Sequence, residues 1–128
     1  MSCRQNLAGF TILLLEDEPL IALDVETALQ DAGARVVGPT RGERGAMEVI
    51  DTAERGGSPR LGGAVLDVHL GSHTCERVAM RLIRLRVPFV FHTGNQRDGD
   101  GFVRSSGAPV IRKPALGVDI VAALCRIV

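Results

Sequence analysis

The stretch Ile12-Leu13-Leu14-Leu15-Glu16-Asp17-Glu18-Pro19 places an apolar run, three acidic residues and a proline side by side. A short continuous apolar run is typical of a strand that is buried on both faces of a sheet. Pro19 suits the first turn of a helix, because a backbone N–H at that position has no intrahelical partner to lose. The stretch therefore predicts a buried strand that leads through an acidic turn into a helix.

The same alternation of apolar runs and helical patterns continues to the end of the chain. After Pro19, apolar residues at positions 21, 25, 28, 29 and 32 form one helical stripe, and Gly33 suits the end of that helix. Four more apolar runs predict buried strands at 35–38, 64–66, 89–91 and 109–111. Further helices are predicted around 46–53, 78–83 and 116–127. Residues 94–107 have only Phe102 and Val103 as large apolar side chains, which predicts a loop with a short or mobile fourth helix.

Strands that alternate with helices predict βα units and a parallel sheet covered on both faces. We therefore expect an α/β fold with a doubly wound, five-stranded parallel sheet in the flavodoxin-like order 2-1-3-4-5. In that topology the ligand crevice lies outside the carboxyl ends of the strands, at the switch point between the first and third. The chain shows no repeat or linker, so we expect one domain over 1–128 with its core at about 11–128.

Composition narrows the classes of function. The 15 basic and 15 acidic residues cancel, which argues against direct nucleic-acid or membrane-surface binding. No apolar run approaches the roughly 20 residues that span a bilayer, and the first residues lack the apolar core of a signal peptide. The cysteines are odd in number, far apart and without Cys-x-x-Cys spacing, at Cys3, Cys75 and Cys125. These features together predict a cytoplasmic protein with reduced thiols.

Chemically active side chains stand at the predicted carboxyl ends of four strands. Glu16 and Asp17 follow the first, Asp67 ends the third, Thr93 ends the fourth and Lys113 follows the fifth. The converging carboxylates would repel one another, and a hard divalent cation such as Mg²⁺ relieves that conflict. Lys113 offers a positive charge to a phosphoryl oxygen, and Thr93 offers a hydroxyl donor. The set is typical of phosphoryl transfer to a carboxylate nucleophile.

Each of these groups has a structural explanation when taken alone. A carboxylate pair after a strand often only stabilises the N-terminus of the next helix. Asp67 could end a turn, and Lys113-Pro114 could begin one. The occurrence of all of them at successive strand ends favours a functional site. The spacing of His69, His73 and Cys75 would suit a zinc site on a helix, but Gly71 and Ser72 favour a solvated loop.

Four motifs give the chain its resemblance to the receiver domains of bacterial two-component response regulators, over about 11–128. They are Leu13-Leu14-Leu15-Glu16-Asp17-Glu18-Pro19, Val65-Leu66-Asp67-Val68-His69-Leu70-Gly71, Phe91-His92-Thr93-Gly94 and Ile111-Arg112-Lys113-Pro114. The segment Pro88-Phe89-Val90-Phe91-His92-Thr93-Gly94 is similar to single-domain receivers with a Pro-Phe-x-Phe-Ala-Thr-Gly-x-Tyr pattern. The chain departs from that pattern at His92, where Ala is usual, and at Gln96, where Tyr is usual. Val110 also stands where many receivers have an aromatic residue.

The resemblance implies a role for each strand-end residue. Asp67 would be the phosphoacceptor, and Asp17, Asp67 and the backbone carbonyl of His69 would bind Mg²⁺ directly. Glu16 would act through a metal-bound water. The remaining implied features are pairing of Lys113 with the phosphoryl oxygens or Asp67, closure of Thr93 on the phosphorylated state, and a cis Lys113-Pro114 bond.

The resemblance also implies partners. The phosphoryl group would come from a sensor histidine kinase or a phosphotransfer protein, the switched surface would serve a downstream protein, and a homodimer is a further option. No separate enzymatic output is expected. Two other interpretations stay open, namely a degenerate receiver that only binds proteins and an aspartyl-phosphate phosphatase. The phosphatase pattern is Asp-x-Asp, and His69 stands here in place of its second aspartate. A flavin site would need a hydroxyl- and glycine-rich loop where this chain has Glu16-Asp17-Glu18.

Overall fold

A five-stranded parallel sheet forms the centre of the molecule in a computed structural model that describes residues 6–56, 60–94 and 101–128. Its strands lie in the order β2-β1-β3-β6-β7, which is the predicted 2-1-3-4-5 order when the main strands alone are counted. Their bounds are β1 (Thr11–Leu15), β2 (Arg35–Thr40), β3 (Gly63–Asp67), β6 (Phe89–Thr93) and β7 (Val110–Arg112). The fold is thus the predicted flavodoxin-like α/β class.

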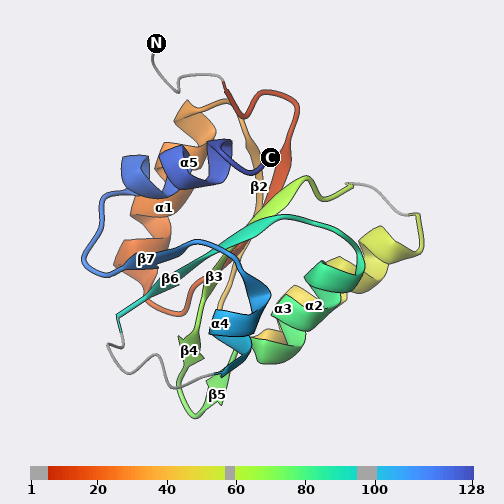
Figure 1. The fold of residues 1–128 in the computed structure, drawn as a ribbon. Coiled ribbons are helices and arrows are strands. Elements are labelled where there is room, and N and C mark those ends of the chain that lie inside the picture. Colours follow the sequence, from red (N-terminus) through yellow and green to blue (C-terminus); the bar gives the residue numbers. More distant parts are fainter. Residues whose placement is uncertain (1–5, 57–59, 95–100) are drawn as a thin grey trace.

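Helices cover both faces of this sheet (Figure 1). One face carries α1 and α5, which lie side by side, and the other carries α2, α3 and α4. The bounds are α1 (Pro19–Asp31), α2 (Glu43–Glu54), α3 (Glu76–Arg84), α4 (Gly101–Ser106) and α5 (Gly117–Cys125). None of the described helices has the length and apolar character needed to cross a bilayer.

Two apolar clusters, one on each face, hold the layers together. Successive residues of β1 point to opposite faces, so Leu13 packs toward α2 and α3 while Leu14 packs toward α1 and α5. The same alternation sends Phe91 to one cluster and Val90 to the other. Burial on both faces explains why the strands appear in the sequence as continuous apolar runs.

The ends of the first helix agree with the sequence prediction. Pro19 begins α1, and Gly33 follows its end with a φ of 95°, a backbone conformation that glycine adopts at little cost. A hydrogen bond connects the two helices on this face, because the N–H of Gly117 donates to Asp24 Oδ2 at 2.9 Å. This bond joins the start of α5 to α1, beside the carboxyl edge of the sheet.

The structure differs from the prediction after Asp67. Residues 69–73 were expected to form a loop, but β4 (His69–Leu70) pairs antiparallel with β5 (His73–Thr74) around a turn in which Gly71 has a φ of 66°. Strands of two residues are too short to show an alternating pattern, so the sequence carried no signal for them. The short fourth helix is confirmed by α4, whereas the mobility expected for 94–107 stays a prediction, and residues 95–100 lie outside the described residues.

Candidate functional site

The predicted site residues do meet at one edge of the sheet. Because β1, β3, β6 and β7 are parallel neighbours, their carboxyl ends lie at the same edge. Asp67 is the last residue of β3 and stands in register with His92 of β6, and Thr93 stands in register with Arg112 of β7. This register sets Lys113 next to Thr93, and the N–H of Lys113 donates to the carbonyl of Thr93 at 2.8 Å.

Three carboxylates gather at the centre of this edge. One oxygen each from Glu16, Asp17 and Asp67 lies within 4.8 Å of the others. Glu16 and Asp67 are almost fully buried, at 2% and 4% exposure, while Asp17 is exposed. An all-oxygen donor set with one side open to water fits a hard cation that keeps some of its own water, as Mg²⁺ does.

Lys113 lies between the two buried carboxylates. Its Nζ is 3.1 Å from Glu16 Oε1, 3.2 Å from Glu16 Oε2 and 3.2 Å from Asp67 Oδ2. The peptide bond that follows, Lys113-Pro114, is cis, as the resemblance implied. One ammonium shared by two carboxylates, with Asp17 beside them, leaves the site with net negative charge, which is the condition that attracts a divalent cation.

This arrangement shifts the protonation of the central carboxyl group. Burial raises the pKa of Asp67 to about 7, and the neighbouring Glu16 carboxylate adds to the rise, while Lys113 opposes it. The positive charge of a bound cation acts in the same direction as Lys113 and favours the ionised form of Asp67. The ionised form is the one that can act as a nucleophile.

The structure brings Thr93 and His69 to the same edge. Thr93 is buried, at 2% exposure, and its part in a phosphorylated state stays a prediction. His69 is half-buried, and its N–H donates to Asp67 Oδ1 at a long 3.4 Å. The binding of a cation by the His69 carbonyl likewise stays a prediction.

His92 of β6 lies closer to the carboxylate cluster than the sequence predicts. Because successive side chains of a strand point to opposite faces, the sequence predicts a packed or surface histidine that points away from Thr93. The structure confirms that it is packed, with 2% exposure, but its Nδ1 lies only 3.8 Å from Glu16 Oε1. Burial lowers the pKa of His92, with a further contribution from Lys113, which favours the neutral ring. The departure from the usual Ala at this position was the signal that could have directed attention to it.

The zinc interpretation of the hairpin gains no support. Cys75 is fully buried in the cluster between the sheet and α3, and His73 is exposed on β5. Within residues 6–56, 60–94 and 101–128, the three carboxylates at the sheet edge are the sole group with metal-binding proximity. The hairpin forms a separate two-stranded sheet after β3.

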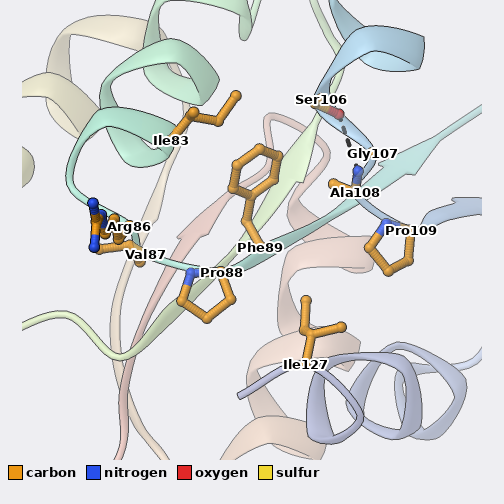
Figure 2. A pocket seen from close by; sticks show the side chains of 10 residues that line it. All are labelled: Ile83, Arg86, Val87, Pro88, Phe89, Ser106, Gly107, Ala108, Pro109 and Ile127. Atoms are coloured by element: carbon orange, nitrogen blue, oxygen red, sulfur yellow. Dashed lines mark hydrogen bonds between the residues drawn. The ribbon is translucent and has the colours of Figure 1, made fainter.

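A separate hollow of about 390 Å³ lies at the opposite edge, at the amino ends of β6 and β7. Figure 2 shows its lining, in which Ile83, Phe89 and Ile127 contribute apolar side chains and Arg86 lies at one side. It contains none of the predicted site residues.

Comparison with known proteins agrees with this geometry, although no protein-family model matches the chain. The chain is 30% identical over 115 residues to the phyllosphere-induced regulator PhyR of Methylorubrum extorquens. The aligned residues cover 90% of this chain and 42% of that protein. It therefore spans less than half the length of this relative.

Solved structures of response regulators have the same fold as this chain. A response regulator receiver protein from Sinorhizobium medicae superposes with a TM-score of 0.75 at 25% identity, covering 92% of this chain and 93% of that one. A response regulator from Burkholderia pseudomallei, described with a phosphorylated aspartic acid, a calcium ion and citrate, superposes with a TM-score of 0.74 at 21% identity, covering 90% and 66%. The fold is thus that of a receiver domain. Together with the sequence likeness, it makes the chain similar to response-regulator receiver domains.

Proposed function

We propose that this receiver domain accepts a phosphoryl group on Asp67 from a histidine kinase or a phosphotransfer protein, with Mg²⁺ bound beside it. The observation that carries the proposal is the position of Asp67 at the tip of β3, buried, 3.2 Å from Lys113 Nζ and grouped with Glu16 and Asp17. A nucleophile, a fixed cation and a cation-binding pair are the parts that phosphoryl transfer requires.

In the proposed reaction an oxygen of ionised Asp67 attacks the phosphorus atom of a phosphohistidine. The new O–P bond forms as the P–N bond breaks, and the donor imidazole leaves with the electron pair of that bond. Lys113 Nζ already contacts Asp67 Oδ2, so its positive charge lies next to the position that the phosphoryl oxygens would occupy. Mg²⁺ held by Asp17, Asp67 and the His69 carbonyl, with Glu16 acting through water, would neutralise further charge on the phosphoryl group.

Thr93 is proposed to report the phosphorylated state. It ends β6 at the same edge, and its hydroxyl would close on a phosphoryl oxygen. An aromatic residue on the fifth strand cannot take part in the response, because the chain contains no Tyr or Trp and β7 carries Val110. The change would then pass to the backbone that follows Thr93 and toward α4.

The partner that delivers the phosphoryl group has to cover the rim of this crevice. Both α1 and α5 begin at the carboxyl edge, and they carry exposed apolar side chains near their first turns. The exposed set consists of Leu20 at 77%, Leu23 at 59%, Leu116 at 66% and Val118 at 63%. We propose that the kinase or phosphotransfer protein packs on this rim, because exposed apolar side chains beside a reactive site are typical of a protein-binding surface.

The test is phosphorylation by acetyl phosphate with Mg²⁺, read by intact mass. Wild type should gain the mass of one phosphoryl group, and Asp67→Asn should gain none. Asp31→Asn, an exposed carboxylate at the end of α1, is the matched control and should behave as wild type. Absence of any gain in the wild type, with both small phosphodonors and a histidine kinase, would instead identify a degenerate receiver that acts only by binding proteins. Phosphorylation of Asp67→Asn at the wild-type rate would refute the assignment of Asp67.

A further inference from the structure

His92 is a buried polar group that the proposed reaction does not use. Both of its ring nitrogens are inaccessible to water, and neither has a hydrogen-bond partner within the described parts of the chain. Buried polar groups are nearly always hydrogen-bonded, so such an exception needs an explanation. The ring lies in β6 directly beside Asp67 in register, and its Nδ1 is 3.8 Å from Glu16 Oε1.

The partner of Glu16 in this structure is Lys113, which also serves Asp67. Lys113 Nζ lies 3.1 Å from Glu16 Oε1, the same oxygen that faces His92, and 3.2 Å from Asp67 Oδ2. The other oxygen, Oε2, accepts an N–H from Glu18 at 3.1 Å and a hydrogen bond from Lys113 Nζ at 3.2 Å. Oε1 therefore has two neighbouring nitrogens, namely Lys113 Nζ in ion-pair contact and His92 Nδ1 about 1 Å beyond hydrogen-bonding distance.

Transfer of a phosphoryl group to Asp67 changes what Lys113 has to bind. An ammonium group has three N–H donors, and new phosphoryl oxygens beside Asp67 compete with Glu16 for them. If Lys113 turns toward the phosphoryl group, the buried Oε1 of Glu16 loses a contact on the side of the His92 ring, whose nitrogens are inaccessible to water. A buried carboxylate oxygen without a donor is unfavourable, so a replacement has to come from close by.

We propose that His92 is a positioning residue that supplies this replacement. Its Nδ1–H donates to Glu16 Oε1 when Lys113 moves to the phosphoryl group, which keeps the Glu16 carboxylate in place while the site is modified. This proposal rests on the proposed function, since it describes the phosphorylated state of the same site. A shift of roughly 1 Å is enough to form the bond from the distance seen here.

Two substitutions separate a hydrogen-bond role from a packing role. In His92→Asn the amide nitrogen is attached to Cγ, as Nδ1 is in histidine, so the donor is retained near the same point. In His92→Leu a methyl group takes that position, and the donor is lost while the shape is similar. Beryllofluoride with Mg²⁺ serves as the phosphoryl mimic, and its binding is followed by fluorine NMR.

The expected result is that wild type and His92→Asn bind beryllofluoride within about twofold of each other, whereas His92→Leu binds it at least about tenfold more weakly, the size expected for a lost hydrogen bond to a charged acceptor. Mg²⁺ affinity without beryllofluoride should be the same in all three proteins. In nitrogen NMR of the wild type, the His92 Nδ1 should carry a proton in the beryllofluoride form, and that proton should exchange more slowly with water than in the free form.

The outcomes are distinguishable. If wild type does not bind beryllofluoride at all, the proposed function fails and this inference with it. If wild type binds it but His92 Nδ1 is unprotonated in the bound form, or its proton exchanges as before, the inference is wrong and the proposed function stands. Equal weakening in His92→Asn and His92→Leu would also overturn it, because packing would then explain the effect.

Discussion

Replacing Asp67 by Asn should change how the stability of the metal-free domain depends on pH. Asp67 has its pKa raised from 3.8 to about 7 in the folded state, with burial as the first cause and Glu16 as the second. The folded protein therefore holds this proton more tightly than the unfolded chain does. The contribution of this group to the free energy of unfolding is present at low pH and is lost as pH rises from about 4 to 7. Above that range the contribution no longer changes with pH.

The magnitude follows from the same shift. A unit of pKa corresponds to about 1.4 kcal/mol, and the portion of the shift that lies between pH 5 and pH 8 amounts to roughly 2 to 3 kcal/mol. The wild type should thus lose about that much stability, relative to Asp67→Asn, over this interval. His92 is present in both proteins, so the opposite effect of its lowered pKa, which favours stability as pH rises, largely cancels in the comparison.

The assay is urea unfolding of both proteins at pH 5, 6, 7 and 8 in the presence of a chelator. Asp31→Asn should follow the wild type across the whole range, since this exposed carboxylate is far along α1 from the site. Mg²⁺ at pH 8 should restore stability to the wild type but do little for Asp67→Asn, because a ligand stabilises only the state that binds it. A difference between wild type and Asp67→Asn that is constant from pH 5 to pH 8, or that grows in favour of the wild type, would refute the assignment of a buried, strained charge to Asp67.

Three further predictions concern the cation, the switch and the packing of α5. Mg²⁺ binding near pH 7 should release roughly half a proton, measured by calorimetry in buffers of different ionisation enthalpy, because Asp67 titrates there; binding without proton release would contradict the raised pKa. Thr93→Ala should be phosphorylated at nearly the wild-type rate but give a smaller change in amide chemical shifts around α4 on activation, and a loss of phosphorylation itself would show a different role. Gly117→Ala should cost about 1 to 3 kcal/mol in urea unfolding, since its Cβ would lie 2.7 Å from Ala28 Cβ and 2.8 Å from the Asp24 carbonyl. Gly101→Ala, with nothing within 4 Å, is its control and should be neutral or stabilising.

The sequence by itself determined the fold class and the set of residues at the carboxyl edge, whereas the strand order was expected only because it is common among doubly wound sheets. Continuous apolar runs such as Ile12-Leu13-Leu14-Leu15 indicate strands that are buried on both faces, and the connecting helices then require parallel pairing. Once the strands are parallel, any residue that directly follows one of them lies at the same edge. That is why Asp67 and Lys113 could be assigned to one site although they are far apart in the chain.

The tertiary structure alone decided how these groups contact one another. The sharing of Lys113 between Glu16 and Asp67, and the raised pKa of Asp67, depend on distances of a few ångströms that periodicity does not encode. The position of His92 is the plainest example, because a histidine at the end of an apolar run could equally be a packed or a surface residue. Only the register of β6 against β3, and the packing of α1 and α5 over that face, buries its ring against Glu16 and away from water.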